Sequence, residues 1–311
     1  MSLNTTPNHL TPLINKVIGD IEFVSESHIH LGDHEPGSSR LAVMRLSENT
    51  FIIPSSSWKG CFRRIAENLA PTMTLSGLER LAVKAYDAGE YRLDPQDEEF
   101  KKIRDEFRDV LSLGKRPSRL SHDMEGLKRF LKDIGYSEEI EGRQELIERS
   151  LDDMVADYLA SFCPLGRLFG NHVLASKLRF HDTILNLETR KIEVRPGVGI
   201  DRSSGTAKED HLFFVEALPM GKQVRMRFIA DNMVPGSSDS KLLAGVLDWI
   251  DKLGLQIGGR KSVGLGLLKP VKPEFYIIDL TKENPQKAIV NPWRYGDKKT
   301  LGQILKWLMK Q

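Results

Sequence analysis

A long charged stretch, residues 72–160, interrupts a sequence that otherwise alternates between strand-like and helix-like patterns. Residues 71–160 contain 15 Lys and Arg against 21 Asp and Glu, a net charge of −6, whereas the rest of the chain has 30 against 22, a net charge of +8. The stretch has a mostly helical pattern, with breaks near Pro95, Gly114–Pro117 and Gly135. We therefore predict a helical insertion at 72–160, so that any central sheet must be assembled from the residues on either side of it.

The residues around this insertion predict the order strand, helix, strands, helix, strand. Helical patterns follow Ser57 and cover 241–253, and strand-like patterns occupy 16–31, 177–187, 191–200, 211–218, 223–230 and the residues from Leu265. This is the order of a ferredoxin-like domain, whose open antiparallel sheet is also the binding surface of RNA-recognition modules. The aromatic signature with which those modules stack bases is missing here, so the sequence does not support that binding mode.

The fold class we predict is α+β, a modified ferredoxin-like (RRM-like) domain with an antiparallel sheet and a large helical insertion. The core would comprise residues 16–71 and 161–275, and residues 72–160 would form a lid-like insertion. Residues 276–311 would form a C-terminal extension with a helix near 301–310. A chain of 311 residues is long enough to bury a core of this size.

Composition narrows the class of partner. Hydrophobic residues make up 40% and charged residues 28% of the chain, as in a soluble globular protein. No apolar run has the length of a membrane span and the N-terminus lacks a signal-peptide pattern, so we expect a cytoplasmic protein with no membrane partner. The two cysteines, Cys61 and Cys163, exclude a disulfide scaffold. A basic body beside an acidic insertion favours a polyanionic ligand.

The loop at 254–266 is the most specific pointer to such a ligand. Five of its thirteen residues are glycine, and Arg260, Lys261 and Ser262 stand at its centre. Glycines can bring backbone N–H groups close to phosphates, beside two fixed charges. A nucleotide-binding P-loop does not fit, because Arg260 stands where that motif needs Lys and because the order is helix, loop, strand. A helix C-terminal turn would account for Gly254 alone.

A second anion site is predicted at the start of the first helix. Ser55, Ser56 and Ser57 are good N-cap residues, and free N–H groups at a helix start favour anions. A buried stripe follows at helical spacing, at Trp58, Phe62, Ile65 and Leu69, while Lys59 and Arg63 lie off that stripe. For Arg63, a solvated helix face is an equally good interpretation.

Five segments in one order resemble the CRISPR-associated RAMP superfamily. They are residues 55–63, 163–170, 197–207, 212–221 and the glycine-rich loop. Within the superfamily the chain is most similar to the repeated backbone subunits of type III (Csm and Cmr) effector complexes, over about residues 17–270. The resemblance implies guide RNA and target RNA as ligands, other CRISPR effector subunits as partners, and head-to-tail stacking of related subunits into a filament.

The resemblance also assigns residues. It places Ser55, Ser56, Ser57 and Lys59 at the guide-RNA backbone, and Arg202 in a thumb-like hairpin that displaces a base at regular intervals. Together with the loop, the RNA-binding residues we predict are Ser55, Ser56, Ser57, Lys59, Arg63, Arg202, Gly258, Gly259, Arg260, Lys261 and Ser262. Without the resemblance, residues 201–211 are typical of a polar hairpin loop.

Backbone subunits of type III complexes commonly cut target RNA with an aspartate in the loop after the first strand, and here that residue is Asp33. The reaction would use the target's 2′-hydroxyl, with a divalent cation such as Mg²⁺ or a nearby cation stabilising the charge, and no organic cofactor. His30 or His34 could assist proton transfer. The alternatives are a turn-forming Asp33 before Pro36 in a non-catalytic scaffold, and a guide-processing endoribonuclease. The last is disfavoured because residues 55–70 contain no histidine.

A structural metal is not expected. Many relatives have a second cysteine close after the first, but this chain has Gly166 three residues after Cys163. A lone cysteine does not make a zinc site, and no cysteine accompanies the histidines at positions 28, 30 and 34.

Overall fold

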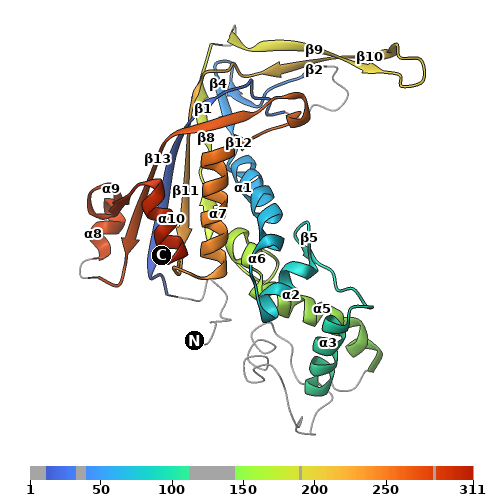
Figure 1. Cartoon of the computed structure of the whole chain (residues 1–311). Helices are drawn as coiled ribbons and strands as arrows, with labels where there is room; N and C mark the ends of the chain where they lie inside the picture. The colour runs from blue at the N-terminus through green and yellow to red at the C-terminus, as the bar shows by residue number, and fades with distance from the viewer. Residues whose placement is uncertain (1–11, 33–39, 112–143, 189–190, 283–284, 311) are drawn as a thin grey trace. The chain divides into compact units, whose positions relative to one another are not determined.

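The computed structural model describes residues 12–32, 40–111, 144–188, 191–282 and 285–310 (Figure 1). The chain divides into two compact units. One is built from Ile14–Ala66 and Leu178–Gln311, and the other mainly from Glu67–Lys177. The second unit thus includes residues 161–177 in addition to the charged stretch, although the sequence analysis placed 161–177 in the core.

The first unit is organised around a six-stranded sheet. Its four main strands are β1 (Asn15–Ser25), β7 (Leu178–Phe180), β11 (Gln223–Asp231) and β13 (Leu267–Asp279), in the spatial order β13-β1-β11-β7. Every neighbouring pair is antiparallel. Helix α1 (Ser55–Leu69) connects β1 to β7 and helix α7 (Ser238–Leu253) connects β11 to β13, and each connection skips one strand. This is the split β-α-β topology of a ferredoxin-like fold, which confirms the predicted α+β class.

One face of this sheet and the two helices form the core. On α1, the ring of Phe62 lies edge-on to Phe180 at 5.0 Å between centroids and 5.9 Å from Phe228, and Trp58 stacks on Phe23. The apolar stripe of α7 is buried as well, at Leu242, Leu243, Val246, Leu247 and Ile250. The β1 residue beneath the Phe228 ring is Gly19, where a Cβ would lie 2.1 Å from a ring carbon. Glycine is required there because the aromatic layer leaves no room for a side chain.

Two predicted strands differ from the structure. The strand expected over 16–31 ends at Ser25, because the backbone N–H groups of Glu26 and Ser27 turn to the carbonyl of Leu267 and the chain then forms an isolated bridge between Ile29 and Leu218. The strand expected over 177–187 is divided into β7 and β8 (Thr183–Asn186), which belong to different sheets.

Two smaller sheets adjoin the main one in this unit. Strands β3 (Arg45–Ser47), β4 (Thr50–Ile53) and β8 form one of them. Strands β2 (Arg40–Leu41), β10 (Ala207–Ala217) and β9 (Glu193–Ile200) form the other. Figure 1 shows β9 and β10 as a long hairpin whose turn lies away from the main sheet.

The residues after β13 pack against the same unit. Strand β14 (Asp297–Lys299) pairs with β13, and α10 (Leu301–Met309) packs on α7. Helix α10 begins with a capping box between Thr300 and Gln303, which satisfies its first N–H groups. The short helices α8 (Pro285–Val290) and α9 (Pro292–Tyr295) lie between β13 and β14 in sequence. Strand β12 (Leu255–Gln256) pairs with the beginning of β13, at the same edge of the sheet as β14.

The second unit is mainly helical. Its elements are η2 (Ala70–Thr72), α2 (Gly77–Ala85), β5 (Tyr86–Asp87), β6 (Glu90–Tyr91), α3 (Glu98–Leu111), α5 (Gln144–Phe162) and α6 (Pro164–Phe169). Aromatic side chains of α3 and α5 hold it together, with Phe107 edge-on to Tyr158 at 5.2 Å and Tyr158 edge-on to Phe162 at 5.0 Å. None of the helices in the described ranges has the length and apolar character that crossing a membrane requires.

Candidate functional site

The glycine-rich loop is folded tightly onto the chain segment that follows β1. The N–H of Gly259 donates to the carbonyl of His30 at 2.9 Å, and the N–H of Gly266 donates to the carbonyl of His28 at 2.8 Å. Gly258 and Gly266 have φ angles of 80° and 87°, and an added Cβ would lie 2.2 Å and 1.9 Å from carbonyl oxygens of His30 and Ile257. These two glycines are therefore required for packing within the protein.

The two cations of the loop have different partners. The guanidinium of Arg260 lies over the ring of Phe213 on β10, 4.3 Å from the ring centroid. The ammonium of Lys261 lies 3.9 Å from the sulfur of Cys61 on α1. Burial raises the pKa of Cys61 although the charge of Lys261 acts against it, so the thiol is protonated at neutral pH and donates to the carbonyl of Gln256 at 3.0 Å. The loop is thus fastened to the hairpin through Arg260 and to α1 through Lys261.

The N-terminus of α1 already has an anionic partner. The N–H of Ser55 donates to the carboxylate of Asp182 at 2.6 Å, and this bond holds the pKa of Asp182 below its usual value. The N–H groups of Ser57 and Trp58 donate to the carbonyl of Pro54 at 2.9 and 3.3 Å. A phosphate at this helix start would therefore meet the negative charge of Asp182.

Two of the three basic side chains of α1, those of Lys59 and Arg63, lie about one turn apart. Lys59 and Arg63 are half-buried and separated by four residues, so they lie on the same side of the helix. Burial lowers the pKa of Lys59, and the charge of Arg63 adds to this effect. Of the three serines, Ser55 and Ser57 are half-buried and Ser56 is exposed.

Arg202 lies at the turn of the β9–β10 hairpin. The carboxylate of Asp201 orders this turn by accepting from the N–H and hydroxyl of Ser203, at 2.7 and 2.6 Å. Arg202 is exposed, whereas Phe213 pairs with Gly197 nearer the base of the hairpin. The structure therefore gathers Arg260, Lys261 and Cys61 around the loop, and it places Arg202 on the order of 15 Å further along the hairpin.

Glu216 of β10 is the centre of a buried charge cluster that the sequence analysis did not identify. Its side chain is 3% exposed and accepts from Nε of Arg40 at 2.8 Å, from Arg45 at 2.5 Å and from the N–H of Val43 at 3.0 Å. Burial alone would raise the pKa of Glu216, but the Val43 N–H and the two arginine charges hold it below its usual value. The ring of His30 donates through Nδ1 to the carbonyl of Glu216 at 2.8 Å.

Beside this cluster, the residues that precede the Asp33 segment are bonded to residues that follow it. Gly32 forms a bridge with Val43, and the N–H of Met44 donates to the carbonyl of Leu31 at 2.8 Å. Asp33 itself, like His34, lies outside the described residues. A carboxylate in the apolar run 212–218 is the sequence signal that could have pointed to Glu216.

The described residues do not offer a metal site. His28 accepts from Arg195 at 2.8 Å and pairs with Glu193 through its other ring nitrogen, while His30 is held by the Glu216 carbonyl. No three His, Cys, Asp or Glu side chains gather in the described ranges as a metal would require. At Gly166, an added Cβ would lie 2.3 Å from the amide nitrogen of Asn171, so that amide occupies the space of a second cysteine side chain.

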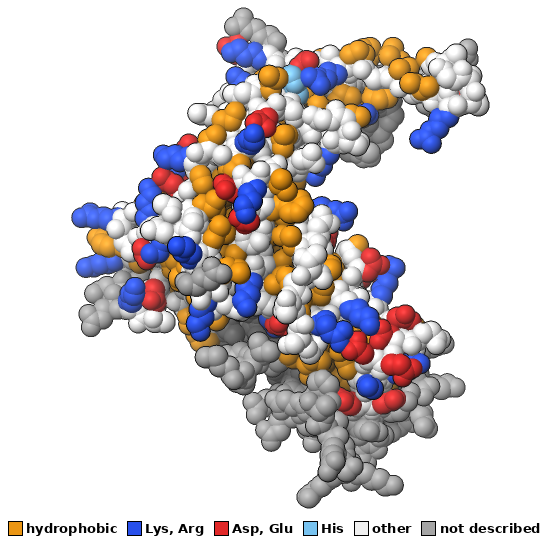
Figure 2. All heavy atoms as spheres, in the orientation of Figure 1, with side chains coloured by type: hydrophobic (Ala, Val, Ile, Leu, Met, Phe, Trp, Pro, Cys, Tyr) orange, Lys and Arg blue, Asp and Glu red, His pale blue; other side chains and the backbone are white. Residues whose placement is uncertain are grey.

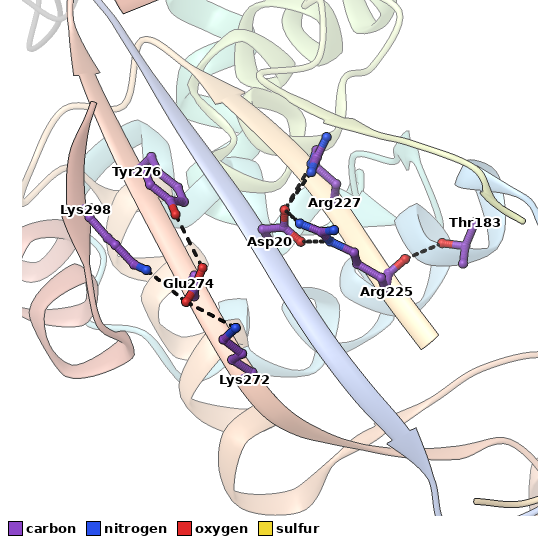
Figure 3. A network of polar contacts seen from close by, with 8 residues as sticks. All are labelled: Asp20, Thr183, Arg225, Arg227, Lys272, Glu274, Tyr276 and Lys298. Atoms are coloured by element: carbon purple, nitrogen blue, oxygen red, sulfur yellow. Dashed lines mark hydrogen bonds and ion pairs between the residues drawn. The ribbon is translucent and has the colours of Figure 1, made fainter. Parts of the chain in front are cut away.

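The face of the main sheet opposite α1 and α7 carries paired charges. Figure 3 shows Asp20 of β1 between Arg225 and Arg227 of β11, and Glu274 of β13 near Lys272 and Lys298. Asp20 is 7% exposed and accepts two bonds of 2.7 Å from Arg225 and one of 2.7 Å from Arg227. Arg260 differs from these cations, because among the described residues its partner is an aromatic ring and no carboxylate forms an ion pair with it.

The hairpin presents an apolar face. Figure 2 shows hydrophobic side chains along it. The exposed apolar residues lie at alternate positions of its two strands and are Val194, Val198, Ile200, Leu212 and Phe214. Exposed apolar side chains at alternate strand positions are an unusual solvent-facing surface and indicate a contact with a partner molecule.

Comparison with known proteins agrees with this arrangement. The family model of the RAMP superfamily matches residues 20–269, which include most of β1, all of β7 and β11, the start of β13, helices α1 and α7, the hairpin and the glycine-rich loop. A search of curated proteins found no match. Membership of that superfamily indicates a CRISPR-associated, RNA-binding function. The match covers most of the chain, and the protein belongs to the RAMP superfamily.

Proposed function

We propose that this protein is a guide-RNA-binding backbone subunit of a type III CRISPR interference complex. The observation that carries the proposal is the position of Arg260, a cation on a tightly folded loop, held against the hairpin and without a carboxylate partner among the described residues. An arginine in this position can hold a phosphate oxygen pair through two parallel N–H bonds. Such contacts read the RNA backbone and not its sequence, as a subunit that must accept any guide requires.

The hairpin supports the same proposal. An apolar strand pair that extends from the sheet can insert between neighbouring bases, where it lowers the cost of unstacking them. Arg202 at its turn would then meet the RNA backbone beyond the displaced base. The proposed ligands are guide RNA and target RNA, and the proposed partners are other CRISPR effector subunits stacked head to tail in the cytoplasm.

The test removes the two cations of the loop. Arg260→Ala with Lys261→Ala should weaken binding of single-stranded RNA of any sequence, and it should reduce the slope of log affinity against log salt by about one to two. The matched control is Lys269→Ala with Lys272→Ala, which removes two cations from β13 that pair with Glu26 and Glu274. If the loop variant keeps the wild-type salt slope, Arg260 and Lys261 do not contact phosphate and the proposed site is wrong.

We further propose that Asp33 takes part in cutting the paired target RNA. The observation that favours this role is that Gly32, the residue before Asp33, lies two residues from His30, whose carbonyl holds Gly259 of the loop. The chain therefore enters the Asp33 segment beside the proposed RNA-backbone contact. Asp33→Ala should abolish periodic target cleavage in the assembled complex while guide binding is retained. Periodic cleavage that persists in this variant with unchanged binding would show that the catalytic assignment of Asp33 is wrong.

A further inference from the structure

The ring of Phe213 is the only described aromatic partner of Arg260, and it is itself held in place from its other side. Phe213 on β10 pairs with Gly197 on β9. A Cβ at position 197 would lie 2.2 Å from a carbon of the Phe213 ring, so the ring lies flat across the neighbouring strand at a point where glycine gives it room. Phe213 thus forms a flat, fixed platform at the base of the hairpin.

The backbone directs Arg260 onto this platform. Arg260 has φ 57° and ψ 34°, a left-handed conformation that is unfavourable for a residue with a Cβ. Such a conformation persists when its surroundings impose it. Here the bond from Gly259 to His30 before Arg260 and the bond from Val263 N–H to the carbonyl of Arg260, at 3.2 Å, fix the loop on both sides.

A planar guanidinium that lies on an aromatic ring keeps its N–H edge directed outward in the plane of the stack. The edge is then available for bidentate contact with a phosphate without a further loss of side-chain freedom on binding. The stack also joins two elements that the sequence separates by 47 positions, the glycine-rich loop and the hairpin.

We propose that Phe213 is a positioning residue for RNA binding. It orients Arg260 toward the RNA backbone. The affinity of the loop for RNA therefore depends on the orientation of the hairpin that carries Phe213. This inference rests on the proposed function, because Arg260 must contact RNA for Phe213 to act through it.

A double-mutant cycle tests the coupling. Phe213→Leu keeps the bulk and apolar character of the side chain but removes the ring, and it should weaken binding of single-stranded RNA by about three- to tenfold. In an Arg260→Ala background the same substitution should have little further effect, because the group that it orients is gone. Phe213→Tyr, which retains the ring, should restore the affinity of the wild type.

Phe214 provides the matched control. It is the next residue of β10, it lies on the opposite face of the strand and its side chain is 38% exposed. Whatever effect Phe214→Leu has on RNA affinity should add to the effect of Arg260→Ala, because the two side chains do not act together. A merely structural role of Phe213 would likewise give an additive cycle with Arg260→Ala, in contrast to the positioning role.

The outcomes separate the two proposals. If Arg260→Ala weakens RNA binding and Phe213→Leu weakens it equally in both backgrounds, or not at all, the positioning role is overturned and the RNA contact stands. If Arg260→Ala leaves RNA affinity and its salt slope unchanged, the proposed RNA contact fails at this loop, and the positioning role fails with it. Circular dichroism and urea unfolding of each variant identify any substitution that acts through loss of the fold.

Discussion

Two glycines of the loop, Gly264 and Gly266, provide an internal comparison of backbone conformation with close packing. Their φ angles are 86° and 87°, so an alanine at either position incurs a similar conformational penalty. They differ in surroundings. A Cβ at Gly264 would meet nothing within 4 Å, whereas a Cβ at Gly266 would lie 1.9 Å from the carbonyl oxygen of Ile257 and 3.1 Å from its carbon.

The expected magnitudes follow from this difference. Gly264→Ala should lower the free energy of unfolding by about 1–2 kcal/mol, the cost of placing a Cβ residue at positive φ. Gly266→Ala should cost the same amount and a further 1–3 kcal/mol or so for overpacking, because the contact is with backbone and no flexible side chain can move aside. The bonds that join Gly266 to His28 and Ile257, at 2.8 and 2.9 Å, would be strained at the same time.

Urea unfolding of the two purified variants and the wild type measures the positive-φ penalty and the overpacking penalty. The dependence of the unfolding free energy on urea concentration should be the same in all three proteins. The affinity for RNA should fall more in Gly266→Ala than in Gly264→Ala, because displacement of the loop at Gly266 also moves Arg260. If Gly266→Ala is no more destabilising than Gly264→Ala, the close contact between Gly266 and Ile257 is not a feature of the folded protein, and the account of the loop as internally packed would be refuted.

Two further predictions concern the carboxylates beside the loop and α1. Glu216→Gln should lower the free energy of unfolding by about 1–2 kcal/mol near neutral pH, since Arg45 loses a buried partner. Because the folded-state pKa of Glu216 is lowered, its contribution is present above the unfolded value of about 4.3 and is lost as the pH falls through the folded value, so the urea-unfolding difference between wild type and variant should disappear in acid. Asp182→Asn keeps an acceptor for Ser55 and removes a negative charge from the start of α1, so it should raise RNA affinity about two- to fivefold at low salt. An unchanged affinity in a filter-binding titration would mean that the α1 N-terminus does not contact phosphate.

The order of elements could be predicted because it depends on local patterns. The apolar stripe at Trp58, Phe62 and Ile65 has helical spacing and all three side chains are buried. The alternation of buried and exposed residues along β11 marks a strand with one covered face. Once the charged stretch is set aside, this order of strands and helices leaves the ferredoxin-like topology as a natural arrangement.

The partners of the site residues could not be predicted, because they are contacts between distant parts of the chain. Ser55 and Asp182 are 127 positions apart, and Cys61 and Lys261 are 200 positions apart. Nothing in the sequence around Asp182 distinguishes a helix-capping carboxylate from a turn residue. The periodicity likewise could not show that the 177–187 pattern divides at His181 and Asp182, where the chain passes from one sheet to another.

The structure changes what the glycines of the loop mean for function. From the sequence, they suggested bare backbone for the approach of a phosphate. In the structure, Gly258 and Gly266 serve the contact with residues 28–30, and the backbone so fixed holds Arg260 in a left-handed conformation over Phe213. The charge that would meet RNA is therefore positioned by contacts within the protein. It follows that a substitution at Gly258, whose added Cβ would lie 2.2 Å from the His30 carbonyl oxygen, should weaken RNA binding without touching RNA, because displacement of the loop carries Arg260 away from its aromatic support.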